Sequence, residues 1–364
     1  MLLKRVLFES RLLKDNFNQA GAKSYEAVLF IPATIFRKRK EGYYSNIINT
    51  LVERIKHVHG DNFILLGLPP FFITVEGHDI KRLNYFLYWR YACNLLLIRG
   101  KDRRIARTFN QVLGLFNAKY VYFTNHVVPF EKMSDERYYI EYLHGFGYSE
   151  IPIYGTENSF KRLSELIVFD SVSMTYLSHT CRKVTSLENA LGRNERVRTV
   201  DSRLLQEYKH VVLFTLTHGY SRTEDLVYGY SLENGLVPNE FLNTFKNMND
   251  VAVIFRFHQV HYQKSYKWAR KIIEELSRKY HNFYSCEFED LSLHELFSIV
   301  TGHVTMASGS IYEAYQSKIK SYSLCPSLLA TGLYPNYLND IVDAGYLEKG
   351  SYRNIEFILK CADL

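Results

Sequence analysis

Short apolar runs recur along the chain and are separated by amphipathic segments. The runs are rich in Val, Ile, Leu, Phe and Tyr, which is typical of strands buried on both faces of a sheet. They predict strands at residues 27–32, 63–66, 96–98, 119–124, 138–144, 165–176, 211–217, 251–257, 282–286 and 320–324, with one more in the run that ends before residue 307.

The segments between these runs predict helices. In residues 44–57 and again in 266–280, apolar side chains recur every three or four positions and so share one helix face. These side chains are Ile47, Ile48, Leu51, Val52 and Ile55 in the first segment, and Ala269, Ile272, Ile273 and Leu276 in the second. Further helices are expected at residues 83–95, 103–116 and 240–247, within 291–302, from residue 311 onward and at the end of the chain.

The alternation of strands and helices indicates parallel sheets covered by helices on both faces. The alternation occurs in two rounds along the chain. A polar stretch with charges of both signs, residues 185–206, separates them. A chain of 364 residues is also too long for one compact core. We therefore expect an α/β protein with two Rossmann-like domains, residues 1–195 and 196–364, that face one cleft.

Residues 298–327 read as a strand, a turn of small residues, a helix and a second strand. The turn is Ala307-Ser308-Gly309-Ser310. Such a turn directs backbone N–H groups and hydroxyls out of the carboxyl edge of a sheet, where anions bind. Ser308 and Ser310 are able to cap the helix or to bind a phosphate oxygen, and Gly309 allows a close approach of the backbone. A plain helix cap is the alternative interpretation.

Other polar residues follow predicted strands in the same way. His144 and Gly145 end the run that starts at residue 138, the sequence His218-Gly219-Tyr220 follows the strand at 211–217, and His258 follows the strand at 251–257. Ligands of open α/β sheets bind beyond the carboxyl ends of the strands. These residues are therefore candidates for binding and catalysis.

Charge and cysteine content narrow the class of protein. The formal charge is +7, with Lys and Arg spread along the chain, which favours an anionic ligand or an anionic membrane surface. No signature of a nucleic-acid-binding protein is visible. The five cysteines have no metal-binding spacing, the His258-x-x-His261 pair lacks a further ligand, and no run is long enough to span a membrane. We expect a cytoplasmic protein with reduced thiols and no metal, in peripheral contact at most with the inner membrane.

The order of motifs in the second half resembles known families. After His258 come the segment Leu-Ser-Leu-His-Glu-Leu, the Ser308-Gly309-Ser310 turn and Glu313-Ala314. This order resembles bacterial sialyltransferases, Kdo transferases and teichoic-acid glycerophosphotransferases, which have the GT-B architecture. Gln259 stands where those families often have Pro. In the first half, His144-Gly145 replaces the acidic motif of the sialyltransferases and is similar to the glycerophosphotransferase pattern.

The resemblance implies roles for the candidate residues. His144 would be the base that deprotonates the acceptor hydroxyl, with Glu150 in reserve. His258 would bind or protonate the leaving phosphate. Asp170 interrupts an apolar run and is a further carboxylate candidate, since some Kdo transferases use a carboxylate nucleophile. The residues that would hold the nucleotide sugar are His218, Gly219, Tyr220, Ser308, Gly309, Ser310 and Glu313, the last on a ribose hydroxyl.

The resemblance also implies a function. The first domain would bind the acceptor and the second a nucleotide sugar, most plausibly sialic acid or Kdo linked to CMP, with no other cofactor. The acceptor would be an oligosaccharide or glycolipid of the bacterial surface, in capsule or lipopolysaccharide. A UDP- or GDP-sugar transferase and a CDP-glycerol-type phosphotransferase are alternatives of the same class. A non-catalytic subunit of a polysaccharide assembly complex is the alternative of a different class. The linkage, the stereochemical course and the oligomeric state stay open, with a homodimer as one option.

Overall fold

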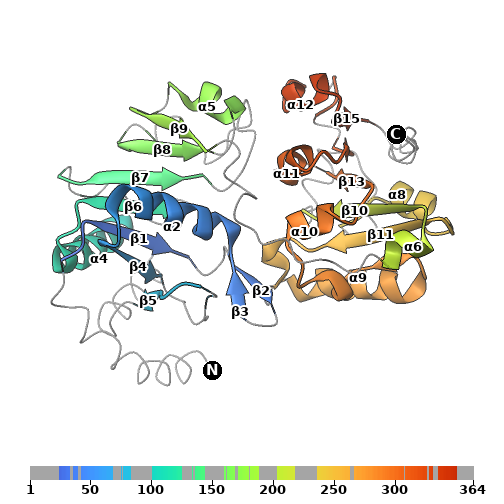
Figure 1. Cartoon of the computed structure of the whole chain (residues 1–364), viewed down its shortest axis with the longest axis horizontal. Coiled ribbons are helices and arrows are strands. Elements are labelled where there is room, and N and C mark those ends of the chain that lie inside the picture. The colour runs from blue at the N-terminus through green and yellow to red at the C-terminus, as the bar shows by residue number, and fades with distance from the viewer. Residues whose placement is uncertain are drawn as a thin grey trace. The chain divides into compact units, whose positions relative to one another are not determined.

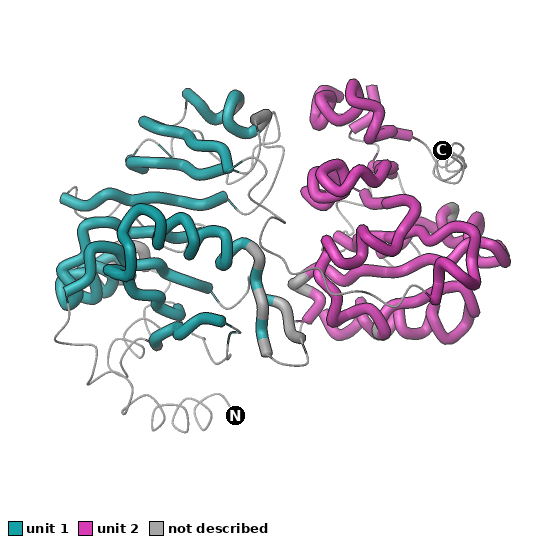
Figure 2. The backbone as a smooth tube through the Cα atoms, viewed as in Figure 1, with its two compact units in different colours: residues 1–144, 152–191 teal, residues 145–151, 192–364 magenta. Residues whose placement is uncertain are grey.

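The computed structural model describes most of the chain and divides it into two compact units (Figure 2). The described residues are 24–32, 36–39, 42–68, 75, 77–82, 101–124, 133, 136–143, 160, 162–168, 171–179, 181–187, 203–217, 236–262, 266–306, 308–325, 328–330 and 335–350. Unit 1 comprises residues 1–144 and 152–191, and unit 2 comprises residues 145–151 and 192–364.

Unit 1 is built on a parallel sheet, which has seven strands in the described part of the chain (Figure 1). The strand order is β5-β4-β1-β6-β7-β8-β9. The strands are β1 (Ala27–Ile31), β4 (Phe63–Gly67), β5 (Lys81–Arg82), β6 (Tyr120–Thr124), β7 (Tyr138–Tyr142), β8 (Glu165–Val168) and β9 (Val184–Ser186). Its helices are α2 (Asn46–His59), α4 (Lys101–Phe116) and α5 (Ser171–Leu177), and β2 (Arg37–Arg39) pairs with β3 (Gly42–Tyr44) as an antiparallel hairpin.

Unit 2 is built on a second parallel sheet, with six strands among the described residues, in the order β12-β11-β10-β13-β14-β15 (Figure 1). The strands are β10 (His210–Thr215), β11 (Val251–Arg256), β12 (Phe283–Tyr284), β13 (Gly302–Thr305), β14 (Ser321–Ser323) and β15 (Leu347–Lys349). The helices are α6 (Arg203–Glu207), α8 (Asn239–Phe245), α9 (Lys267–Lys279), α10 (Leu293–Phe297), α11 (Ser310–Gln316) and α12 (Asn339–Asp343), with 3₁₀ turns η4 (Gln259–Tyr262) and η6 (Cys286–Phe288).

Both faces of the unit 2 sheet are buried. Successive strand residues point to opposite faces, so each strand contributes to two apolar layers. Val212 and Phe214 of β10 belong to a layer with residues of α8 and α9, whereas Val211 and Leu213 belong to a layer with residues of α6, α10 and α11. The near-continuous apolar runs of the sequence follow from this double burial.

The strand order places a topological switch point between β10 and β13. From β10 the chain first adds β11 and β12 on one side, and then returns to add β13, β14 and β15 on the other. Crossover connections therefore leave in opposite directions from these two neighbouring strands. In open α/β sheets, ligands bind in the crevice at the carboxyl ends of such a pair.

Most predicted elements are confirmed, and one prediction is wrong. Residues 165–176 are not one strand: β8 ends at Val168 and α5 begins at Ser171. Ser173 and Leu177, four residues apart, are buried while the intervening Met174 is exposed, which is helical spacing. The candidate linker, residues 185–206, overlaps strand β9 at one end and helix α6 at the other, and residues 188–202 lie outside the described residues. The predicted elements at 83–95, 96–98 and the end of the chain lie outside the described residues.

Candidate functional site

The carboxyl edge at the switch point is lined by hydroxyl side chains. Thr215 ends β10 and Thr305 ends β13, and the two residues are register partners. The hydroxyl of Thr305 donates to the backbone carbonyl of Thr215 over 3.0 Å. Both threonines are buried. These contacts tie together the ends of the two strands between which a ligand is expected.

The Ser308-Gly309-Ser310 turn lies directly above this edge, between β13 and α11. Gly309 is the N-cap of α11, with φ −58°, and provides no side-chain cap. The hydroxyl of Ser308 accepts from the backbone N–H of Ser310 over 3.2 Å. Ser308 and Gly309 are half-buried, and Ser310 is 6% exposed. Ser308 thus meets a first-turn amide, as predicted for a capping serine, whereas Ser310 does not.

The hydroxyl of Ser310 points into the protein. It lies 2.9 Å from Oγ1 of Thr215 and 3.3 Å from Nε2 of His303, a residue of β13 that sequence reasoning missed. The same Nε2 lies 2.9 Å from Oγ1 of Thr215. On the other side of the ring, Nδ1 of His303 lies 2.8 Å from the hydroxyl of Ser321 on β14. The Ser310 hydroxyl is therefore bonded within the sheet, and its predicted contact with a phosphate stays a prediction.

His303 is neutral in this environment. It is completely buried and contacts the ring of Phe297 edge-on, with centroids 5.5 Å apart. Burial disfavours the charged imidazolium and lowers the pKa of His303 from 6.5 to about 3. An imidazole with so low a pKa is a weak base at neutral pH. Ser310, His303 and Ser321 are arranged in the order of a nucleophile, a base and an orienting group. Because the base is so weak, these residues are not suited to activate Ser310 as a nucleophile.

His258 occupies the end of β11, next to β10. Its backbone N–H donates to Nδ1 of His261 over 3.1 Å, and its carbonyl accepts from the backbone N–H of His261 over 2.9 Å. These bonds close the 3₁₀ turn η4. His258 is half-buried, whereas His261 is fully buried. Strands β11 and β13 are separated by β10 alone, so His258 and Ser308 project from one edge of the sheet, about 10 Å apart if they follow the strand spacing.

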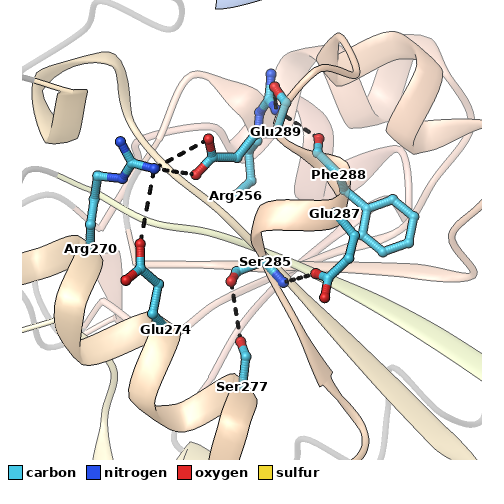
Figure 3. A network of polar contacts seen from close by, with 8 residues as sticks. All are labelled: Arg256, Arg270, Glu274, Ser277, Ser285, Glu287, Phe288 and Glu289. Atoms are coloured by element: carbon cyan, nitrogen blue, oxygen red, sulfur yellow. Dashed lines mark hydrogen bonds and ion pairs between the residues drawn. The ribbon is translucent and has the colours of Figure 1, made fainter.

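Two arginines hold the loop that follows β12 beside this edge (Figure 3). Arg256 of β11 is buried and its Nη1 donates to the carbonyls of Phe288 and Glu289 over 3.2 and 3.0 Å. Arg270 of α9 donates from Nη2 to both carboxylate oxygens of Glu289, over 3.0 and 3.4 Å. The Arg270 guanidinium also lies over the rings of Phe257 and Tyr262, at 5.7 and 5.3 Å. Arg256 thus fixes the backbone of this loop at Phe288 and Glu289.

The segment Leu-Ser-Leu-His-Glu-Leu forms the start of α10. Ser292 is the N-cap and accepts from the backbone N–H of Glu295 over 3.1 Å, while the Glu295 carboxylate accepts from the backbone N–H of Ser292 over 2.6 Å. This reciprocal pair is a capping box. Glu295 is buried, and its carboxylate caps the first turn of α10. Glu313, on the first turn of α11, is half-buried.

The remaining predicted site residues lie outside the described residues. These are His144, Glu150, Asp170, His218, Gly219 and Tyr220. Of the predicted set, the described residues are His258, Ser308, Gly309, Ser310 and Glu313, all in unit 2. Within the described ranges, no group of three or more His, Cys, Asp or Glu side chains is arranged to hold a metal ion. No helix in the same ranges is long and apolar enough to cross a membrane.

The two units together give the fold. Each has a parallel sheet covered by helices, as in solved structures of the GT-B fold, so the predicted α/β class with two Rossmann-like domains is confirmed. No protein-family model and no curated protein matches the sequence.

Solved structures with the same fold include UDP-GlcNAc 2-epimerases and a teichoic acid polymerase. MnaA of S. aureus, determined with UDP, has a TM-score of 0.54 at 11% identity, covering 92% of this chain and 87% of that one. A variant of the wall teichoic acid polymerase TagF has a TM-score of 0.54 at 14% identity, covering 100% and 86%. The UDP-GlcNAc 2-epimerase of Methanocaldococcus jannaschii, in complex with UDP-GlcNAc and UDP, has a TM-score of 0.53 at 11% identity, covering 93% and 91%. At these identities the likeness establishes the fold.

Proposed function

We propose that this protein is a glycosyltransferase that binds a nucleotide-activated donor at the carboxyl ends of β10, β11 and β13 in unit 2. The observation that carries the proposal is the position of the half-buried Ser308-Gly309 turn at the switch point, with His258 projecting from the same edge. Enzymes with this fold that act on UDP-GlcNAc support a nucleotide-sugar ligand.

Each described residue has a proposed task. The hydroxyl of Ser308 and the backbone of Gly309 contact the phosphate of the donor, and His258 donates a proton or hydrogen bond to the leaving phosphate. Glu313 accepts from a ribose hydroxyl. These groups stabilise the leaving phosphate without a metal ion. Ser310 has the indirect task of holding the turn, since its hydroxyl bonds to Thr215.

The base on the acceptor side stays a prediction from the sequence. We propose His144 for this role, with Glu150 and Asp170 as the carboxylate alternatives. His218, Gly219 and Tyr220 remain proposed donor contacts, because they follow β10 at the switch point in the sequence. The acceptor proposed is an oligosaccharide or glycolipid of the bacterial surface, reached at the anionic inner face of the membrane, to which the net charge of +7 is suited.

The donor proposed first is a CMP-linked sugar, sialic acid or Kdo. A CDP-glycerol-type phosphotransferase is the second candidate, favoured by the similarity to TagF over 100% of this chain. Glycosyl transfer from a CMP-sugar breaks the bond between the anomeric carbon and phosphate and releases CMP. Transfer of glycerol phosphate from CDP-glycerol breaks the pyrophosphate link and also releases CMP. Both candidates therefore require a site for CMP, whereas a UDP- or GDP-sugar transferase requires a site for a nucleoside diphosphate.

The first experiment is thermal stabilisation by CMP, CDP, UDP, GDP and ADP. A ligand that binds the native state at one hundred times its dissociation constant adds about 2.7 kcal/mol to the free energy of unfolding. A shift with CMP that is lost in Ser308→Ala and His258→Ala supports the proposal. A shift with UDP or GDP instead replaces the donor by a UDP- or GDP-sugar. No shift with any nucleotide favours the non-catalytic subunit and contradicts the enzyme.

A second measurement separates the two CMP-releasing reactions. Wild-type protein is incubated separately with CMP-sialic acid, CMP-Kdo and CDP-glycerol, and CMP release is followed with and without an acceptor glycan. Release from a CMP-sugar supports glycosyl transfer, and release from CDP-glycerol alone supports phosphotransfer. The matched control is Lys271→Arg, a charge-conserving change on the exposed side of α9 that leaves the Ser308 hydroxyl and His258 in place.

A further inference from the structure

One histidine connects three separate elements beneath the switch point. The ring of His303 on β13 reaches the hydroxyls of Thr215, Ser310 and Ser321, at distances of 2.9, 3.3 and 2.8 Å. Thr215 ends β10, Ser310 begins α11 and Ser321 begins β14. Thr215 and Ser310 also bond to each other over 2.9 Å. The ring therefore joins both strands of the switch point to the first turn of α11.

This polar cluster lies where the sheet is otherwise apolar. Leu213, the register partner of His303, packs in the apolar layer of α6, α10 and α11, and Ala314 of α11 belongs to the same layer. An aliphatic residue at position 303 would suit that layer. A buried polar group costs free energy unless all of its hydrogen bonds are made, and a fully bonded network fixes one arrangement of its members. The bonds of His303 thus determine where the first turn of α11 sits relative to β10.

We infer that His303 is a positioning residue that, through Thr215, Ser310 and Ser321, sets the Ser308-Gly309 turn in register with the carboxyl ends of β10 and β13 for binding of a nucleotide phosphate. The inference rests on the proposed function, because the nucleotide site is the one proposed for unit 2. His303 itself does not touch the ligand, since it is completely buried beneath Ser310.

The contacts indicate how loss of the His303 imidazole would reach the phosphate-binding turn. Ser310 is held from both sides, by Thr215 and by His303, and Ser308 is bonded to the N–H of Ser310. Loss of the imidazole releases Ser310, and through Ser310 it releases the groups proposed to contact the phosphate. A displacement of about 1 Å in a binding constellation is enough to weaken its action by one or two orders of magnitude.

The test compares His303→Phe with a matched control in the same sheet. Phenylalanine keeps a planar ring against Phe297 but makes no hydrogen bonds with the three hydroxyls. The control is Asn282→Ala. Asn282 is also completely buried, and its Nδ2 donates to the carbonyls of Phe245, Met248 and Val251 over 2.8, 3.1 and 2.9 Å. It lies at the start of β11 and β12, the opposite edge of the sheet from the site.

Two measurements are made on each variant. The first is the dissociation constant of CMP by calorimetry, with UDP in parallel as the alternative probe. The second is amide hydrogen exchange of Ser310 and Ile311 without nucleotide. We expect His303→Phe to raise the dissociation constant of the nucleotide by about tenfold or more, because the displaced turn no longer fits the phosphate. It should also speed exchange at both amides. Asn282→Ala should lower the melting temperature but change the dissociation constant by no more than about twofold, because distant sites act independently.

The outcomes are separable. Binding and exchange in His303→Phe that match wild type overturn the inference, and so does an equal loss of binding in Asn282→Ala. If wild-type protein binds neither CMP nor UDP, the proposed function is overturned and the inference falls with it. If His303→Phe does not fold, Ser321→Ala replaces it, since this change removes only the partner of Nδ1. The inference then requires weaker nucleotide binding in Ser321→Ala and recovery towards wild type in Ser321→Thr.

Discussion

The backbone N–H of His258 donates a hydrogen bond to Nδ1 of His261 over 3.1 Å. Nδ1 of His261 is therefore an acceptor, and a neutral His261 carries its proton on Nε2. The bond closes the turn after β11, and it leaves Nδ1 of the buried His261 ring bonded to the backbone. Of the two histidines, the half-buried His258 is the one that a ligand at the sheet edge can reach.

The exchange of His258 for Ala should remove activity without unfolding the protein. We expect CMP release from the donor to fall by about 10²-fold or more, the size typical of a lost acid or base. The melting temperature should change little, because the side chain is half-buried and its backbone bonds remain. His261→Ala is the control and should lower the melting temperature through loss of the turn. Turnover by His258→Ala at the wild-type rate would remove His258 from the site.

The two serines of the turn should differ in their effect on stability. Ser308→Ala should weaken nucleotide binding and leave stability close to wild type, because Ser308 is half-buried beside the proposed phosphate. Ser310→Ala should lower the free energy of unfolding by about 1–3 kcal/mol, because Thr215 and His303 lose a buried partner. Urea denaturation and calorimetry separate the two effects. A larger stability loss in Ser308→Ala than in Ser310→Ala would contradict the assignment.

Acid should destabilise the protein through His303. Its pKa is lowered by burial from 6.5 to about 3, so between these values the unfolded chain binds a proton that the folded protein does not. The folded state is therefore favoured above about pH 6.5 and loses stability as the pH falls towards 3, by up to about 1.4 kcal/mol per pH unit for this group. Urea denaturation at a series of pH values measures the slope. The slope should be smaller in His303→Phe, and an unchanged slope would contradict the prediction.

The exchange of Arg270 for Lys should loosen the loop after β12. Lysine keeps the charge but loses the paired bonds to Glu289 and the planar group over Phe257 and Tyr262. We expect a loss of about 1 kcal/mol in the free energy of unfolding, since the ion pair is partly exposed. Lys271→Arg is the control, because Lys271 lies on the exposed side of α9 and pairs within the helix with Glu275. Equal stability of the two variants would show that Arg270 does not clamp the loop.

The sequence predicted some of the candidate site residues and omitted others, for a physical reason. His258 and the Ser308-Gly309 turn were predicted because they follow apolar strands. His303 interrupts such a strand between Gly302 and Val304, which is the same kind of signal that Asp170 gives in its apolar run. Asn282 and Arg270 carry no such signal, because their partners are carbonyls and rings distant in the sequence.

The amino-acid sequence by itself determined the α/β class, the two rounds of alternating elements and the positions at which strands such as β11 and β13 end. These features depend on the local period of apolar residues, which burial on both faces of a sheet imposes. Only the tertiary structure decided that the hydroxyl of Ser310 turns inward to Thr215, 95 residues away, and to His303. The register of parallel strands sets which side chains meet across a sheet, and that register arises from pairing between segments far apart in the chain.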